Sequence, residues 1–122
     1  MSEILLTIAA ILGFATLLVH SIVGEKRLIG PLVHSNDGVM SNDLAKQVTR
    51  FAWHFTSILG LIATFILAKS AYNFAEADIA LLAVTGSAFL ISGIYDAIIT
   101  KGKHIGWPML AAVGALTLFA II

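Results

Sequence analysis

The sequence predicts an all-α protein, a polytopic transmembrane four-helix bundle that forms one integral membrane domain over residues 1–122. Hydrophobic residues make up 59% of the chain and charged residues only 11%, whereas a soluble domain has about 25% charged residues. The apolar residues fall in four runs of about the length that a helix needs to cross a hydrocarbon core of roughly 30 Å. These runs are apolar on all sides, so they lack the polar face of a helix in a soluble bundle.

The four spans are expected at residues 4–23, 51–68, 79–99 and 105–122. The first run has Glu3 as its only early charge and no basic n-region, so we expect a retained helix rather than a signal peptide. The second helix should begin near Asn42, because Ser41-Asn42-Asp43 offers an N-cap well before the apolar run. The third run is interrupted only by Asp96. The fourth has Pro108 in its first turn, where the missing N–H costs little.

The connection between the first two spans is long. Gly30-Pro31 is expected to break any continuation of the first helix, and Asn36-Asp37-Gly38 is a strong turn signal. The residues around the break are too apolar for a free loop. We therefore expect this piece to lie along the membrane surface; it comprises Leu28, Ile29, Leu32 and Val33.

The direction of the spans follows from the basic residues in the short loops. One side holds Lys26, Arg27, Lys46, Arg50, Lys101 and Lys103, and the other holds only Lys69. The sequence therefore predicts both termini outside and the 1–2 and 3–4 connections in the cytoplasm, in a bacterial inner (plasma) membrane. The net charge is zero, which gives no indication of a nucleic-acid partner. The absence of cysteine excludes disulfides and thiolate catalysis.

One ionisable residue lies just inside the cytoplasmic boundary on each of three spans. His20, His54 and Asp96 each lie about 6 to 7 Å inward of a charged residue along a helix. Ionisable side chains within spans are costly and are candidates for function. The candidate polar site has these three residues at its centre and Glu25, Arg27 and Arg50 at its rim, provided that the helices pack so that the three meet.

Three segments resemble a known group of proteins. They read VHSIVGEKRLIGPL, RFAWHFTS and IYDAIITKGKHIGWP, and they are similar to segments of small four-helix bacterial inner-membrane proteins of unassigned function. The resemblance implies four spans and no particular activity.

His20, His54 and Asp96 form a polar layer, in which Ser21, Ser57, Ser92 and Tyr95 also fall. Three interpretations of this layer remain open. The first is a hydrogen-bonded network that sets the register of the helices. The second is a metal site, in which His20, His54 and Asp96, with Glu25 as a fourth ligand, hold Zn²⁺ or non-haem Fe²⁺, or in which His20 and His54 ligate haem b. The third is a site for an anionic lipid or small metabolite at a basic rim of Arg27, Arg50, Lys101 and Lys103.

The sequence favours a protein that is not an enzyme, because no nucleophile motif accompanies the histidines. Acid–base chemistry by His54, oriented by Asp96, is a minor alternative. The expected partners are the lipid bilayer and anionic lipids. A homo-oligomer is also considered, because small residues at Gly86–Gly93 and Gly114-Ala115 suit close helix packing.

Overall fold

The computed structural model describes residues 1–122, and its secondary structure is entirely helical. The first helix runs unbroken over Ser2–His34; it comprises α1 (Ser2–Leu18), the wide π-type segments η1 (Val19–Val23) and η2 (Glu25–Ile29), and α2 (Gly30–His34). Next come the short η3 (Gly38–Ser41), α3 (Asp43–Tyr72) and the short η4 (Phe74–Glu76). The chain ends with α4 (Ile79–Ile99) and α5 (Trp107–Ala120).

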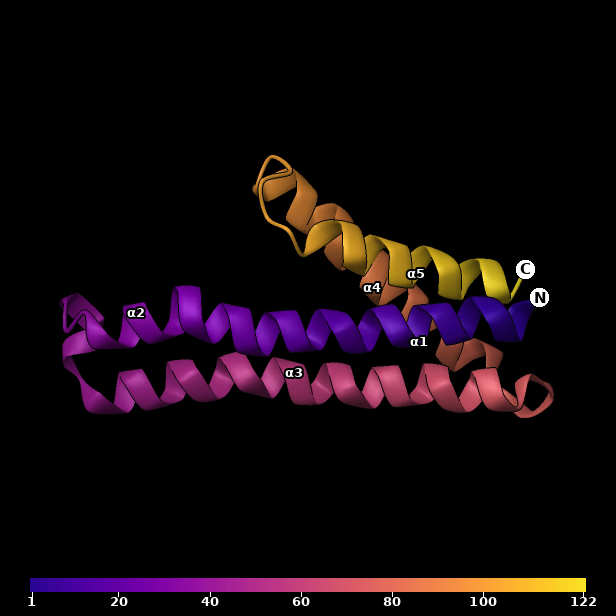
Figure 1. Ribbon diagram of the computed structural model, residues 1–122, viewed down its shortest axis with the longest axis horizontal. Helices are drawn as coiled ribbons and strands as arrows, with labels where there is room; N and C mark the ends of the chain where they lie inside the picture. The colour runs from indigo at the N-terminus through magenta and orange to yellow at the C-terminus, as the bar shows by residue number, and fades with distance from the viewer.

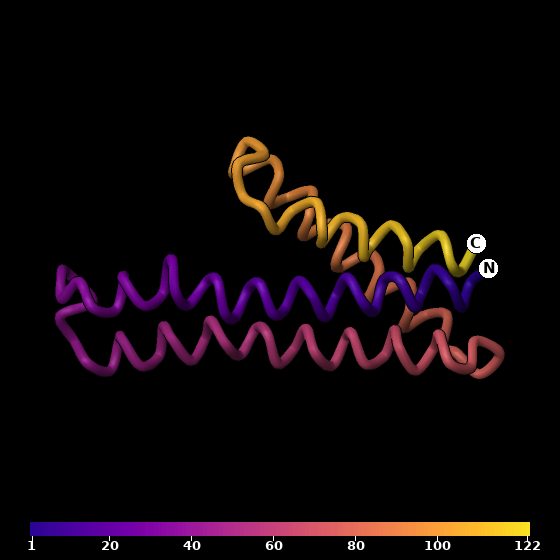
Figure 2. The backbone as a smooth tube through the Cα atoms, in the orientation of Figure 1, coloured from indigo at the N-terminus to yellow at the C-terminus, as the bar shows by residue number.

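The helices form two antiparallel hairpins. The first helix and α3 lie side by side along the whole length of the molecule, whereas α4 and α5 form a shorter hairpin (Figures 1 and 2). The second hairpin packs on α1 beside the chain termini and diverges from it toward its own loop (Figure 1). We call the end with both chain termini the terminal end, and the opposite end the basic end, since six of the seven Lys and Arg residues lie toward it.

Three helices are long and apolar enough to cross a membrane: Ser2–His34, Asp43–Tyr72 and Ile79–Ile99. The fourth, Trp107–Ala120, is apolar but shorter. The first helix has 33 residues, so at 1.5 Å per residue it is about 50 Å long. Because a hydrocarbon core is only about 30 Å thick, part of this helix must extend beyond it.

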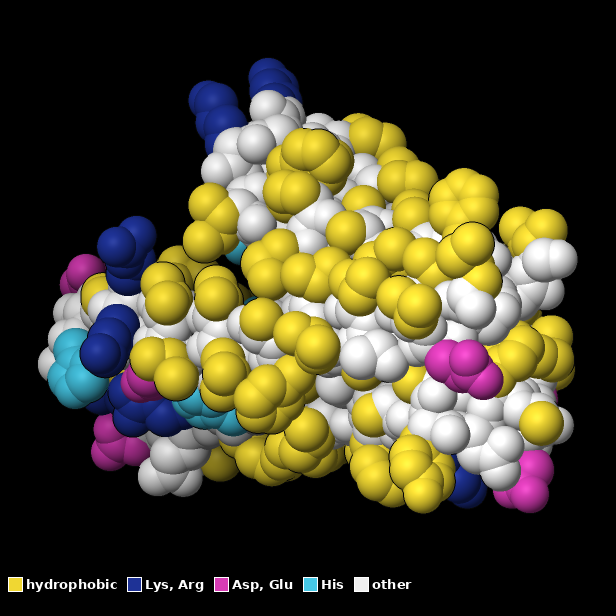
Figure 3. All heavy atoms as spheres, turned by 45° about the vertical axis from the view of Figure 1, so that its right-hand side comes forward, with side chains coloured by type: hydrophobic (Ala, Val, Ile, Leu, Met, Phe, Trp, Pro, Cys, Tyr) yellow, Lys and Arg dark blue, Asp and Glu magenta, His cyan; other side chains and the backbone are white.

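The tightly packed core lies toward the terminal end, where all four helices meet. Leu6, Leu67, Leu82 and Val113 are fully buried there, one from each helix. Most other large hydrophobic side chains are exposed on the outer surface, which Figure 3 shows as a nearly continuous apolar covering. Such a surface suits lipid contact, because acyl chains solvate apolar side chains as well as a protein core does.

Several local predictions are confirmed. The span predicted at 79–99 coincides with α4, Ile79–Ile99. Asn42 caps α3, and its side chain accepts hydrogen bonds from the backbone N–H groups of Leu44 and Ala45. Pro108 occupies the first turn of α5. The other helices are longer or shorter than their predicted spans, since α3 begins eight residues before its apolar run and α5 covers 107–120 rather than 105–122.

The predicted break at Gly30-Pro31 is wrong. The helix continues to His34. Of the four apolar residues around the predicted break, Ile29 and Val33 are buried, whereas Leu28 and Leu32 are exposed. A proline clashes with the carbonyl four residues earlier in a tight α-helical turn. Here Gly30 N–H donates to Glu25 O, five residues back, so the preceding turn is wide. We infer that this widening gives the ring of Pro31 room without a break.

Candidate functional site

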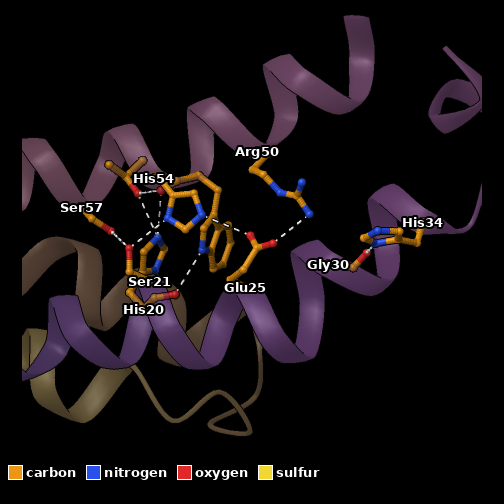
Figure 4. Close-up of polar contacts among 10 residues, drawn as sticks. His20, Ser21, Glu25, Gly30, His34, Arg50, His54 and Ser57 are labelled. Carbon is orange, nitrogen blue, oxygen red and sulfur yellow. Dashed lines mark hydrogen bonds and ion pairs between the residues drawn. The ribbon is translucent and has the colours of Figure 1, made fainter. Parts of the chain in front are cut away.

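A chain of polar side chains links the first helix to α3 near the basic end (Figure 4). Arg50 Nη2 lies 2.9 Å from Glu25 Oε1, and Glu25 Oε2 lies 3.1 Å from His54 Nε2. His54 Nδ1 lies 3.0 Å from Ser21 Oγ, which is also 3.0 Å from Ser57 Oγ. We call these five residues the polar seam. It is a continuous hydrogen-bonded chain from a charged pair to two hydroxyl groups.

Helical spacing places the members of the polar seam opposite one another. Ser21 and Glu25 are four residues apart on the first helix, so they share a face. Arg50, His54 and Ser57 share the facing side of α3, as their 4-3 spacing predicts. The antiparallel arrangement then brings Glu25 between Arg50 and His54, and Ser21 between His54 and Ser57.

His20 joins the same two helices by different contacts. Its ring stacks on Trp53 with the centroids 4.1 Å apart and an angle of 11° between the planes. Trp53 Nε1 donates to His20 O at 3.1 Å, and His20 Nε2 lies 2.9 Å from Thr56 Oγ1. Gly24 makes this possible, because a Cβ there would come within 2.9 Å of the Trp53 indole ring. Trp53 is therefore a packing partner of His20.

Asp96 does not join the two histidines that the sequence grouped with it. Its Oδ2 lies 2.5 Å from His104 Nδ1, in the α4–α5 connection. No group of three or more His, Asp or Glu side chains is close enough to hold a metal ion. The predicted metal-ligand set of His20, His54 and Asp96, with Glu25 as a fourth ligand, is therefore not brought together. Haem ligation by His20 and His54 also fits poorly, because both ring nitrogens of His54 are already engaged.

A cleft of about 840 Å³ separates the two hairpins toward the basic end. Figure 3 shows the molecule hollowed between the hairpins, with apolar side chains around the opening. The polar and aromatic lining comes from the first helix, α3, α4 and the α4–α5 connection, and it includes His20, Arg27, Trp53, Ser92, Lys103 and His104. The rest is mainly apolar, and no acidic residue lines the cleft. Neither Arg27 nor Lys103 forms an ion pair.

The six candidate site residues therefore fall into three places. Glu25, Arg50 and His54 belong to the polar seam, while His20 and Arg27 line the cleft. Asp96 stands apart and holds His104. Sequence reasoning placed Ser21 and Ser57 only in the general polar layer, and it gave no role to His104. The polar seam could have been predicted from helical spacing. Ser21 and Glu25 are four residues apart on the first helix, and Arg50, His54 and Ser57 share one face of α3.

The glycines considered for self-association pack within the chain instead. A Cβ on Gly93 would lie 2.5 Å from Ala111 N, and one on Gly114 would lie 2.6 Å from Gly86 O. These residues therefore hold α4 against α5.

No family model, curated protein or solved structure matches this chain. The site is consequently interpreted from its own geometry.

Proposed function

We propose that this protein is a four-span protein of a bacterial inner membrane that binds an anionic amphiphile in the cleft between its hairpins. The cleft itself is the observation that carries this proposal. It combines a mainly apolar lining with two cations, Arg27 and Lys103, that have no acidic partner. A ligand with an apolar body and one anionic group would satisfy both features.

The size and position of the cleft support an amphiphile over a free anion. A volume of about 840 Å³ is within the range of pockets that hold ligands of several tens of atoms. The mostly apolar lining would remain unfilled by inorganic phosphate. A basic residue near a membrane surface contributes about 1 kcal/mol to attraction of anionic lipid. Loss of both cations should therefore weaken binding about tenfold to thirtyfold.

The test compares two double variants with the same change in charge. Arg27→Gln/Lys103→Gln removes the cations of the cleft, and Lys26→Gln/Lys101→Gln removes their sequence neighbours outside it. Native mass spectrometry and thermal shift would be measured with phosphatidylglycerol, phosphatidylcholine and glycerol phosphate. We expect the wild-type protein to retain phosphatidylglycerol selectively. The Arg27→Gln/Lys103→Gln variant should lose this retention, and the Lys26→Gln/Lys101→Gln variant should keep it. Equal losses in both variants would show a nonspecific effect of charge, and equal binding of glycerol phosphate would point to a free anion.

The proposed orientation has both termini outside and the basic end in the cytoplasm. Its support is the six-to-one distribution of Lys and Arg, since basic residues are retained on the cytoplasmic side. Single cysteines introduced at Ser2 and Asn36 would test it in intact cells with a membrane-impermeant maleimide. We expect labelling at Ser2 only, and labelling at Asn36 alone would reverse the orientation.

Haem b is a second candidate ligand of the cleft, because two imidazoles line it. His104 is bonded to Asp96 through Nδ1, which leaves Nε2 free, and a carboxylate behind a ligating histidine is a common arrangement. His20 lines the same cleft, and although its Nε2 is engaged by Thr56, its Nδ1 has no hydrogen-bond partner. A Soret band in purified protein that is lost in His104→Gln but kept in His34→Gln would support haem. Protein that takes up no added haem would exclude it.

A further inference from the structure

The polar seam arranges a hydroxyl, an imidazole and a carboxylate in the order used by serine hydrolases. Ser21 Oγ lies 3.0 Å from His54 Nδ1, and His54 Nε2 lies 3.1 Å from Glu25 Oε2. Both distances are within the reach of a hydrogen bond. None of the three residues lines the cleft between the hairpins. The seam is therefore a separate site, and its chemistry does not depend on the ligand of the cleft.

The contacts around Glu25 determine the positions of the protons. Arg50 Nη2 donates to Glu25 Oε1 at 2.9 Å, and a carboxylate can only accept hydrogen bonds. A charged Glu25 accepts from N–H at His54 Nε2, which leaves Nδ1 of the neutral ring as an acceptor toward Ser21. Ser21 then donates its O–H to Nδ1. Ser57 must be the donor in the contact between the two serine hydroxyls, which are 3.0 Å apart.

The seam opens sideways, onto the surface that lipid would cover. The His54 side chain is 38% exposed and that of Glu25 is 30% exposed. Exposed apolar residues flank them on the same two helices, among them Leu18, Ile22 and Ile58. Ser21 is four residues inward of Glu25, about 6 Å along the helix. Since each interfacial zone of a bilayer is about 5 to 7 Å thick, this depth matches the boundary where acyl chains join their headgroups.

We propose that Ser21 is the nucleophile of an acyl-ester hydrolase that acts on membrane lipids, with His54 as its general base. Ser21 Oγ forms a bond to the ester carbonyl carbon while its proton passes to His54 Nδ1. The ester C–O bond then breaks, and the leaving alkoxide takes that proton and departs as an alcohol. Glu25 is a positioning residue that holds the imidazole in the required tautomer.

Water completes the reaction. It gives one proton to His54 Nδ1 while its oxygen bonds to the acyl carbon. The bond to Ser21 Oγ then breaks, Ser21 recovers the proton from His54, and a fatty acid is released. No oxidant or metal is required. The Ser57 hydroxyl, which donates to Ser21 Oγ at rest, would donate to the oxyanion that forms during both steps.

The first experiment treats folded wild-type protein in nanodiscs with a long-chain fluorophosphonate and maps the adduct by mass spectrometry. We expect labelling at Ser21, together with release of fatty acid from a fluorogenic acyl-ester lipid. Ser21→Ala should abolish both. Ser87→Ala is the matched control, because it removes a serine of α4 that lies outside both the seam and the cleft, and it should leave both unchanged. Folded wild-type protein that carries no label on Ser21 would overturn the proposal, whatever the variants do.

The second experiment separates a base from a structural contact. His54→Gln keeps a polar side chain in the seam but cannot take a proton, and it should slow labelling at least about 100-fold. Glu25→Gln should lower kcat with little change in KM. Glu25→Asp, which keeps the carboxylate, should have a kcat between those of Glu25→Gln and the wild type. Melting temperatures would be measured alongside. A labelling rate that is the same in His54→Gln as in wild type would show that the seam only joins the two helices.

Discussion

The two hairpins are held together in different ways. Near the basic end, the first helix and α3 are linked by side-chain hydrogen bonds through Glu25, His54 and Ser21. The α4–α5 pair relies on close backbone approach at glycines, and its side-chain hydrogen bonds, such as Asp96 to His104, lie at the loop. In lipid, both small residues and polar side chains bring helices together. Only the polar contact leaves groups that can react, which is why the proposed chemistry lies on the first pair.

The largest expected effect is the loss of α4–α5 packing in Gly114→Leu. A Cβ at this position would lie 2.6 Å from Gly86 O and still closer to the backbone of Leu90. Since backbone cannot move aside as a side chain can, we expect a loss of about 3 kcal/mol in unfolding free energy. Chemical unfolding in detergent would measure it, with Ala80→Leu on the exposed side of α4 as the control. Similar losses in both variants would mean that α4 and α5 do not depend on close packing.

The next effect should come from Glu25→Ala, which removes the shared acceptor of Arg50 and His54. Hydrogen bonds to charged groups contribute about 1.5 to 3 kcal/mol. Because Glu25 is partly exposed, we expect about 1.5 kcal/mol. The control is Asp43→Ala. Asp43 forms an ion pair with Lys46 at the surface, so its loss should cost less than about 0.5 kcal/mol. Equal costs would mean that the seam is no stronger than a surface ion pair.

Gly24→Ala should disturb the aromatic stack with a smaller effect on stability. Its Cβ would overlap the Trp53 ring, and a side chain can shift to relieve such overlap at about 1 kcal/mol. In a Trp107→Phe background, Trp53 is the only tryptophan. Its emission should shift to longer wavelength as the ring leaves His20. An unchanged spectrum would show that the ring keeps its stack with His20.

The smallest effect should follow Asp96→Ala. This change frees His104, whose side chain is 53% exposed, so we expect a cost below about 1 kcal/mol. Hydrogen exchange should accelerate in residues 101–106, while residues 20–27 and 50–57 keep their protection. Faster exchange in the polar seam would reveal a coupling between the hairpins that their contacts do not suggest.

Local features were predictable because they depend on residues close in the chain. The Asn42 cap needs only the backbone of Leu44 and Ala45, and the bounds of α4 follow from one apolar run. The error at Gly30-Pro31 is also local in origin. The usual rule assumes an α-helical turn, and the wide turn with its Gly30-to-Glu25 hydrogen bond was not visible in the residue pattern.

The sequence by itself determined the helical architecture and the apolar surface and predicted a common depth for the histidines, because composition and helical rise are properties of single segments. The tertiary structure decided which polar groups meet. His20, His54 and Asp96 were predicted to lie at similar depths, yet Asp96 pairs with His104 while His54 pairs with Glu25 and Ser21. Depth places a side chain along the membrane normal only. Its partners depend on helix rotation and neighbours, which are set by packing such as Gly24 under Trp53 and Gly93 against Ala111.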